Sequence, residues 1–433
     1  MASAGPTLVI GGGIAGLMCA RTLARAGQPV LIVEREPEVG GRVRTTLRDG
    51  FRLDHGFQVL FTAYPVLTSA LDLPALSLRE FRPAAQIADG AGGVALVGDA
   101  LADLSLLLPT LAAATLPLGD KLRLLRLRYF ATSMSFEECF APRFDRVSTR
   151  AFLRTRGFSR AAIDAFFAPF YGGILLDRSL ATSASVLLYT FKMLAEGRTA
   201  VPAAGMGAIA SQLAAGLPAG SVRLNAPVVR LVRDGSAVRG VALADGELVS
   251  AARVVLACEA PSIATIAATA QVHVPVPDAG LGCATVYLGS RRPLLDGTAL
   301  WLNASPDATV SHAVTISNVA PTYAPSGSSL TAATVLGAAA TLDDETLVSR
   351  VRADLSRMSG TAEPALAELL AVWRVPFSQY AQPPGSVARR VAAATSLPGL
   401  FVASEVSHTS SLEGAARGGV AAADAVLGSI RHG

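Results

Sequence analysis

The sequence predicts an α/β fold in which a Rossmann-like domain is interleaved with an α+β domain. Three observations carry this prediction: a glycine-rich turn between an apolar run and a helical segment at residues 7–26, a glycine-rich helical segment near the C-terminus, and two successive hairpin signals in the middle of the chain. Because the first domain draws on separated segments, the residues between them must form the second.

Length and composition place the chain among large folded proteins. At 433 residues it is too long for one small core, so two lobes are expected. Hydrophobic residues make up 51% and charged residues only 16%, which excludes the composition of disordered chains. The net charge of +4 gives no strong field for nucleic acid, so no nucleic-acid partner is expected.

The four cysteines have neither the CxxC spacing of metal sites nor the density of a disulfide framework. No metal is therefore expected. The N-terminal MASAGPT shows neither a basic nor an apolar leader region before the first strand, so we expect a cytoplasmic protein.

The stretch LVIGGGIAGLMCARTLARAGQPVLIVERE predicts a βαβ unit. We expect a strand over residues 7–10, a helix over 15–26 and a second strand over 30–34. These lengths and the order of the elements are typical of the first half of a nucleotide-binding sheet.

Three glycines occupy the first turn of this unit. Gly11, Gly13 and Gly16 fit G-x-G-x-x-G, in which the first makes the tight turn, the second lets the backbone approach a pyrophosphate and the third lets the helix pack on the strand. The start of the helix, at Ile14 and Ala15, then offers free N–H groups to phosphate.

An acidic residue ends the second strand. Glu34 lies where a carboxylate accepts both ribose hydroxyls of an adenosine, and this argues against a 2′-phosphate on that ribose. Arg35 follows and is expected to contact the same ligand. Strand, helix and acid together predict dinucleotide binding.

The next segment, EPEVGGRVRTT, distinguishes between dinucleotides. Gly40 and Gly41 permit a second close approach of the backbone, and Arg42 supplies a cation where the pyrophosphate lies, which a nicotinamide domain does not need. With these residues the chain resembles the flavoprotein superfamily of flavin amine oxidases, protoporphyrinogen oxidases and phytoene desaturases (GR2-type flavoproteins). The resemblance implies an FAD cofactor, with Glu34 at the adenosine ribose and the GGR motif beside the FAD.

The C-terminal segment LFVASEVSHTSSLEGAARGGV carries the same resemblance. An apolar strand at 400–403 leads through a polar turn into a small-residue helix from about Leu412, with Ser410 or Ser411 as its N-cap. In the family such a helix start lies near the pyrimidine edge of the isoalloxazine, where its dipole would stabilise negative charge on the reduced ring.

The resemblance also implies individual contacts at this end. Gly414 and Ala415 would let the flavin ring come close, and Glu405 matches the acidic residue that holds the ribityl chain. This chain has Ser404-Glu405 where the family usually has Gly-Asp.

The middle segments complete two domains. Turns at 234–235 and 245–246 predict two hairpins, which resemble the family's adenine-side β-meander, with the backbone of Val228 at the adenine. We expect an FAD-binding domain from 1–84, 201–261 and 386–433, and a substrate-binding domain from 85–200 and 262–385, helical over 100–200.

An aromatic cluster falls in the predicted substrate domain. Phe166, Phe167, Phe170 and Tyr171 lie within one helix and its end. This spacing favours packing over a role as a substrate wall.

Residues 104–128 form an uncharged stretch followed by basic residues among leucines. The stretch is too short to span a bilayer, and Pro109 and Pro117 interrupt it. Two interpretations stay open: a patch that contacts a membrane and admits a lipophilic substrate, which would make the protein membrane-associated, or a buried helix pair over the pocket.

The type of reaction is predicted from the absence of a lysine in the segment where flavin amine oxidases carry one. A flavin takes a hydride equivalent at N5 while the protein orients the substrate, so no side-chain base is obligatory. Amine oxidases of the superfamily usually have a substrate-domain lysine linked through water to N5, but Lys121 and Lys192 precede the expected segment. We therefore predict an FAD-dependent oxidoreductase that dehydrogenates or desaturates a bulky hydrophobic substrate, similar to carotenoid desaturases or protoporphyrinogen oxidases.

Other functions stay open on this scaffold: a flavin amine oxidase acting on a C–N bond, a non-redox flavin-dependent isomerase and a prenyl carrier without flavin. The intact glycine motifs argue against the carrier. The catalytic residues are not identified by the sequence. Its candidates are His55 and His408, which lie near the flavin motifs, and Arg178 and Tyr323. The last two, like Trp301 and Tyr380, are pocket candidates only because of the segments in which they lie.

Overall fold

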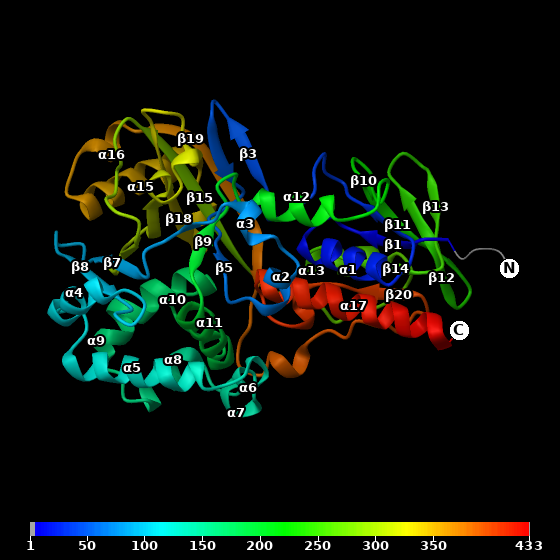
Figure 1. The fold of residues 1–433 in the computed structure, drawn as a ribbon, viewed down its shortest axis with the longest axis horizontal. Helices are drawn as coiled ribbons and strands as arrows, with labels where there is room; N and C mark the ends of the chain where they lie inside the picture. The colour runs from blue at the N-terminus through cyan, green and yellow to red at the C-terminus, as the bar shows by residue number, and fades with distance from the viewer. Residues whose placement is uncertain (1–4, 433) are drawn as a thin grey trace.

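The computed structural model of the protein describes residues 5–432. Two sheets dominate it, a five-stranded parallel sheet at one end and a seven-stranded mixed sheet towards the other (Figure 1). A group of helices lies beside the larger sheet and completes that end of the molecule (Figure 1).

The predicted βαβ unit is present, and its bounds lie within one residue of those expected. It consists of β1 (Thr7–Ile10), α1 (Ile14–Arg25) and β2 (Val30–Val33). Every residue of β1 is buried, because this strand is paired on both sides and helices cover the sheet.

The five-stranded sheet places the first glycine turn at a topological switch point. Its order is β10-β2-β1-β14-β20, with β10 at Val222–Arg223, β14 at Val254–Leu256 and β20 at Leu400–Val402. The chain moves from β1 to β2 on one side and later to β14 on the other, so the order reverses at β1. Ligands of open α/β sheets bind outside the carboxyl ends of the strands at such a point.

The predicted C-terminal helix is α17 (Leu412–His432), and Ser411 is its cap, because its Oγ accepts a hydrogen bond from the Gly414 N–H at 2.9 Å. The helix packs tightly on α1: a Cβ on Gly419 would lie 2.3 Å from the Ala15 carbonyl oxygen. Helices α1 and α17, which come from opposite ends of the sequence, therefore pack against each other.

The predicted hairpins are also confirmed. Strands β11 (Val228–Asp234), β12 (Ala237–Leu243) and β13 (Leu248–Ser250) form an antiparallel meander.

The seven-stranded sheet has the order β19-β15-β18-β17-β16-β7-β8. Helix α15 (Asp344–Ser359) packs on one face through apolar contacts with residues such as Val286 and Ala333. The strands are β7 (Ala84–Ala88), β8 (Val94–Gly98), β15 (Gly280–Ser290), β16 (Leu300–Asn303), β17 (Val310–Thr315), β18 (Ser329–Leu336) and β19 (Glu368–Tyr380).

The region 100–200 is helical, as predicted. Its centre is α11 (Ala184–Glu196), which is buried from Ala184 to Met193. Around it lie η1 (Leu104–Leu106), α4 (Leu107–Ala112), α5 (Leu118–Thr132), α6 (Phe136–Cys139), α7 (Pro142–Asp145), α8 (Thr149–Thr155), α9 (Arg160–Ala162), the π-helical turn η2 (Ile163–Phe167) and α10 (Ala168–Leu175). Within residues 5–432, no helix has the length and hydrophobicity needed to cross a bilayer.

Short elements connect these units. They include two small sheets, formed by β3 (Thr45–Arg48) with β4 (Phe51–Asp54), and by β5 (Leu60–Phe61), β9 (Thr199–Val201) and β6 (Arg79–Glu80), and the helices α2 (Pro65–Ser69), α3 (Leu73–Leu76), α12 (Gly207–Ala215), α13 (Ala260–Ala268), α14 (Ile316–Val319), η3 (Pro321–Tyr323), η4 (Gly337–Thr341), α16 (Glu363–Leu366), η5 (Val387–Arg389) and η6 (Glu405–Ser407). The strands of the two main sheets come from the segments assigned to the two predicted domains, apart from Ala84 at the boundary. The domain division itself stays a prediction.

Candidate active site

A cavity of about 1130 Å³ runs from the carboxyl edge of β1 into the helical region. The β1–α1 turn, the segment after β2, the start of β11 and the start of α17 line its first part. One face of the seven-stranded sheet and helices α4, α5, α10 and α11 line the second. The cavity therefore joins the two main parts of the fold.

The three glycines of the first turn have different roles. Gly11 has a φ of +108° and lies so close to the next strand that a Cβ would be 2.6 Å from the Ala257 carbonyl oxygen. A Cβ on Gly16 would be 2.0 Å from the Gly11 carbonyl oxygen, so this glycine allows the helix to pack. Gly13 lines the cavity, and a Cβ there would meet no protein atom within 4 Å. The space over Gly13 is available to a ligand.

The start of α1 is free to bind an anion. Among the residues that the structure describes, no side chain caps it, and Ile14 and Ala15 line the cavity. Its first N–H groups and its positive dipole end therefore suit a pyrophosphate.

Glu34 is buried and holds the backbone around the expected ribose site. Its Oε2 accepts from the Gly12 N–H at 2.6 Å, and its Oε1 accepts from the Glu36 N–H at 3.0 Å. Each oxygen keeps a further lone pair, so the carboxylate can also accept hydroxyl groups of a ligand.

The second glycine pair lies against the first turn. Gly40 has a φ of +125° and donates its N–H to the Gly12 carbonyl at 2.8 Å, and Gly41 has a φ of +58°. Both line the cavity. A side chain at either position would strain the backbone where two loops meet.

Arg42 joins this loop to the C-terminal part of the chain. It forms a 2.6 Å ion pair with buried Glu405 and donates to the Ser378 carbonyl at 2.7 Å. Burial lowers the pKa of Arg42, but the charge of Glu405 outweighs this, and the pKa is raised. Both residues line the cavity, so a cation and a carboxylate face the ligand together.

These features fit an elongated dinucleotide such as FAD. Every residue predicted to contact the cofactor lines the cavity, except Gly16 and Gly414. A Cβ on Gly414 would lie 1.8 Å from the Thr409 carbonyl oxygen, so that glycine permits a close turn behind the site. The individual contacts stay predictions.

Among the catalytic candidates, His55 lines the cavity. Its ring stacks on Trp373, with centroids 4.1 Å apart, and its Nε2 lies 2.8 Å from the Thr46 Oγ1. Burial and then the nearby Arg44 lower the His55 pKa to about 4. The imidazole is therefore neutral at pH 7 and is not a ready source of a proton.

Arg178 and His408 are not among the residues that line the cavity. Arg178 donates to the Asn303 carbonyl at 3.0 Å. His408 lies half-buried in the turn before α17, and burial, followed by Arg390 and Arg417, lowers its pKa to about 4. These positions argue against direct contact with a substrate.

Two further residues proposed by segment also lie elsewhere. Trp301 belongs to the core on the α15 side of the large sheet and donates to the Asp296 carbonyl at 3.0 Å. Tyr380 is buried near Glu405. The large sheet has two buried faces, and its sequence alone does not show which one borders the cavity.

Tyr323 is fully buried outside the cavity and donates to Asp54 Oδ2 at 2.9 Å. Asp54 also accepts from Thr45 Oγ1 and the Met206 N–H, and its carbonyl accepts from Tyr287. This cluster joins β4, η3, the segment before α12 and β15. The structure thus gives Tyr323 a role in packing rather than in catalysis.

We expect Asp54 to make stability depend on pH. Burial raises its pKa to about 6, although hydrogen bonds from Thr45, Met206 and Tyr323 oppose the rise. As pH rises, the Asp54 carboxyl of the unfolded chain therefore gives up its proton at a lower pH than that of the folded chain. The free energy of unfolding should fall by roughly 3 kcal/mol as pH rises from 4 to 7. In urea titrations across this range, the difference between the wild type and Asp54→Asn should change by that amount; a constant difference would contradict the assignment.

The aromatic cluster of the helical region is only partly core. Phe167 is buried in packing, as predicted, but Phe166, Phe170 and Tyr171 line the cavity. They extend from a π-helical turn into α10, and such turns are frequent at functional sites. With Leu124, Phe191 and Leu194 they wall what we call the apolar arm of the cavity.

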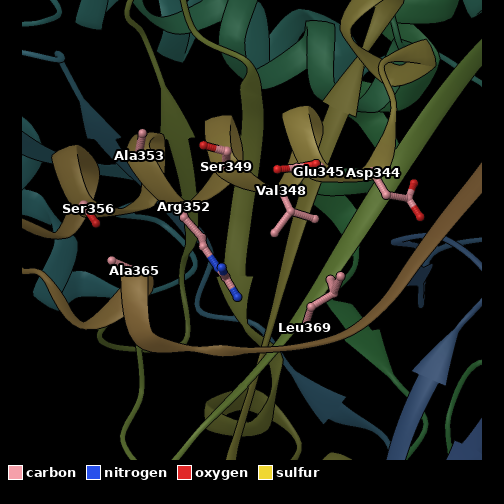
Figure 2. Close-up of a pocket in the computed structure, with 9 residues that line it drawn as sticks. All are labelled: Asp344, Glu345, Val348, Ser349, Arg352, Ala353, Ser356, Ala365 and Leu369. Atoms are coloured by element: carbon pink, nitrogen blue, oxygen red, sulfur yellow. The ribbon is translucent and has the colours of Figure 1, made fainter.

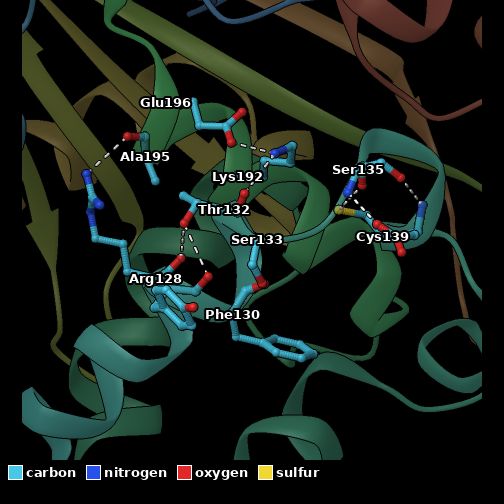
Figure 3. A network of polar contacts seen from close by, with 11 residues as sticks. Arg128, Phe130, Thr132, Ser133, Ser135, Cys139, Lys192, Ala195 and Glu196 are labelled. Atoms are coloured by element: carbon cyan, nitrogen blue, oxygen red, sulfur yellow. Dashed lines mark hydrogen bonds and ion pairs between the residues drawn. The ribbon is translucent and has the colours of Figure 1, made fainter.

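Neither lysine lies beside the large sheet. Lys121 lines the cavity together with the exposed Leu107, Leu111 and Leu125, and we call this part of the cavity the mouth of the apolar arm. Lys192 has a structural place: its Nζ donates to Glu196 at 2.5 Å and to the Thr132 carbonyl, while Arg128 donates to the Ala195 carbonyl, so that α5 and α11 are joined (Figure 3).

A second hollow, of about 490 Å³, lies between α15 and the residues leading into β19 (Figure 2). Arg352 extends across it and donates to the Ala367 carbonyl at 2.6 Å. The Arg352 guanidinium thus holds α15 to the segment before β19, and no residue of the glycine turn lines this hollow. The large cavity is the candidate active site.

A dinucleotide groove that opens into an apolar arm is the arrangement of a flavoprotein oxidoreductase. A family model of flavin-containing amine oxidoreductases matches residues 14–427. The chain belongs to this family, and FAD is its cofactor. The predicted superfamily, fold class and cofactor are thus confirmed, and the protein is an FAD-dependent oxidoreductase.

Solved structures share this fold. A protein from Exiguobacterium sp. 255-15 assigned as a protoporphyrinogen oxidase is 19% identical, with 99% of each chain covered and a TM-score of 0.75. Wild-type putrescine oxidase bound to putrescine is 19% identical, with 98% of this chain and 99% of that chain covered and a TM-score of 0.72. At such identities the likeness establishes the fold alone.

A curated relative matches a short segment. An inactive all-trans-retinol 13,14-reductase from Danio rerio is 46% identical over 50 residues, which are 12% of this chain and 8% of that protein. The match therefore covers less than a tenth of the relative's length.

Proposed function

We propose that the protein dehydrogenates or desaturates a bulky hydrophobic substrate. The observation that carries this proposal is the apolar arm, which is walled by leucine and aromatic side chains and is continuous with the dinucleotide groove. FAD supplies an acceptor for a hydride equivalent at N5. The substrate would lose that hydride and a proton, and a double bond would form between the atoms that carried them.

The protein's part in this reaction is to position carbon and exclude water. Phe166, Phe170 and Tyr171 offer broad apolar surfaces for a ring or polyene skeleton. Oxidation of a C–N bond is the alternative that the family name supports. The large sheet brings no lysine to the cavity, which favours the first reaction.

Anaerobic mixing of the oxidised holoenzyme with polyenes, a porphyrinogen and alkylamines tests the proposal. We expect bleaching of the flavin absorbance by an apolar C–H donor and not by the amines. Bleaching by amines alone would overturn the proposal in favour of C–N oxidation. If the reduced enzyme converts one of these compounds to an isomer without consuming an electron acceptor, the protein is an isomerase. A chain that takes up no FAD would indicate a carrier.

We infer that the mouth of the apolar arm contacts a bilayer. On α5, Leu118, Leu122, Leu125 and Tyr129 share one face and are 64%, 54%, 52% and 77% exposed. Helix α4 buries no residue, which argues against a covered helix pair. Leucines of both helices are exposed and also line the cavity, so the outer apolar surface continues inward: Leu107, Leu111 and Leu125. A surface of this kind suits binding partners or lipid.

Charge favours an anionic lipid surface as the partner. The nearby acids are each paired: Asp99 with Arg128 at 2.9 Å, Asp103 with Arg82 at 3.2 Å and Asp120 with Arg123 at 3.2 Å. Among residues 5–432, Lys121 and Arg126 form no such pair, which leaves positive charge at the mouth.

Substitutions at the mouth test this contact. Leu104→Ser, Leu108→Ser and Leu122→Ser combined should weaken binding to phosphatidylcholine–phosphatidylglycerol vesicles by about tenfold or more, because each leucine loses apolar burial in the membrane. Leu366→Ser, at an 83% exposed position on α16, is the control and should bind like the wild type. Co-sedimentation gives both values, and a wild-type protein that stays in the supernatant would contradict the contact.

A further inference from the structure

Four polar residues form a row across the large sheet. Trp373 on β19 lies opposite Thr285 on β15, Thr285 opposite Thr334 on β18, and Thr334 opposite His312 on β17. Residues directly opposite one another on antiparallel strands project from the same face. Trp373, Thr334 and His312 line the cavity, so this row faces it.

Three members of the row have unused hydrogen-bonding atoms. Thr285 Oγ1 accepts from the Phe57 N–H at 3.2 Å. In contrast, Trp373 Nε1, Thr334 Oγ1 and His312 Nδ1 are buried without a partner in the described chain. Unpaired buried polar atoms are costly and rare, and three in one row of a cavity point to a ligand.

The backbone is shaped around this row. Strand β17 has a bulge at Ser311, because Val310 pairs with Val335 while His312 pairs with the adjacent Thr334. Bulges of this kind redirect a side chain next to a site. On the facing helix α10, a Cβ on Gly173 would lie 2.7 Å from His312 Nδ1, so only glycine leaves room for the imidazole.

The charge around the row selects the ligand chemistry. The acids that line the cavity lie at the dinucleotide groove or, for Asp99, in an ion pair at the mouth. Burial, and then Arg178, lower the pKa of His312 to about 4, so the ring is neutral. The indole N–H of Trp373 can only donate, the threonine hydroxyl can donate or accept, and among residues 5–432 no carboxylate stands beside the row, which favours an oxygen acceptor over an ammonium group.

We propose that the polar row of Trp373, Thr334 and His312 is a subsite on the cavity wall that binds the carbonyl or carboxylate group of an otherwise apolar substrate. This inference rests on the proposed function, since it treats the apolar arm as the substrate site. The subsite would fix which end of the substrate enters the arm and thereby which carbons meet the flavin.

Binding of simple probes to the holoenzyme tests the subsite. Dodecyl acetate, dodecanoate and dodecylamine, kept below their micelle concentrations, share a chain and differ in the polar group. Titrations followed by flavin difference absorbance and calorimetry should show Kd values for the ester or the carboxylate at least about tenfold below that for the amine. Tightest binding of the amine, or binding of none of the three, would overturn the proposal.

Matched variants assign the effect to the row. Thr334→Val and Trp373→Phe keep shape and stacking, and each should weaken binding of the oxygen probes about three- to tenfold while leaving the amine unchanged. Ser311→Ala is the control, because its hydroxyl is also buried and unpaired but does not line the cavity. Unchanged Kd values in both cavity variants, with full FAD absorbance, would overturn the subsite. Failure of every C–H donor to bleach the flavin would instead overturn the proposed function alone.

Discussion

Glu34→Arg is expected to leave the purified protein with less than about one tenth of the wild-type FAD content, because hydrogen bonds to a charged group contribute about 1.5–3 kcal/mol each. The carboxylate accepts from the N–H groups of Gly12 and Glu36, and it also presents its remaining lone pairs to the cavity. Arginine has no acceptor and is too long for this buried position, so both the loop and the ribose contact are lost.

Glu34→Gln is a milder change at the same position. The amide keeps one acceptor oxygen, so it can hold only one of the two N–H groups, that of Gly12 or that of Glu36, while its NH2 group faces the other. We expect an intermediate FAD content, measured as the ratio of flavin to protein absorbance after gel filtration. Unchanged occupancy in Glu34→Arg would show that the ribose assignment is wrong.

The dinucleotide half of the site was predictable because its signals are local. Residues 7–34 contain strand, turn, helix and acid in one continuous stretch, and together these features predict a βαβ unit. The start of α17 was predictable for the same reason, since Ser411 caps it from within the segment. Such features depend on neighbours in the sequence and need no knowledge of the rest of the fold.

The substrate half was not predictable in the same way. The polar row of Trp373, Thr334 and His312 is made by the pairing of four strands, β19, β15, β18 and β17, and no spacing in the sequence predicts it. Both faces of the large sheet are buried, so its strands lack the alternation that separates an inner from an outer face. For this reason the sequence suggests Trp301, which lies on the α15 side, as a pocket residue and does not suggest Trp373.

Nearness to a motif in the sequence was also a poor guide to catalysis. His408 lies between Glu405 and α17, yet its side chain does not reach the cavity, whereas His55 does. Tyr323 is a candidate only because of the segment in which it lies, and its hydroxyl is used in the core, where it donates to Asp54. The direction of a side chain in a turn depends on tertiary packing, which a single sequence does not show.

Breaking the ion pair between Arg42 and Glu405 should be among the most destabilising single changes, although 363 residues separate its members. Glu405 is nearly fully buried, so Arg42→Met leaves an uncompensated charge and should lower the free energy of unfolding by about 3–5 kcal/mol. The double variant Arg42→Met/Glu405→Gln contains no such charge. It should therefore lose less stability than Arg42→Met alone, and the sign of this difference identifies burial of charge as the cause.

Urea unfolding of the holoenzyme, followed by circular dichroism, measures these values. The exposed pair of Arg239 and Asp234, 3.3 Å apart, provides the control, because Arg239→Met should cost no more than about 1 kcal/mol at a solvated site. Equal decreases in the free energy of unfolding for Arg42→Met and Arg239→Met would mean that breaking the buried pair costs no more than breaking an exposed one. A double variant less stable than Arg42→Met would mean that Glu405 contributes through its contact with the cofactor, because removing its charge then costs more than leaving that charge unpaired.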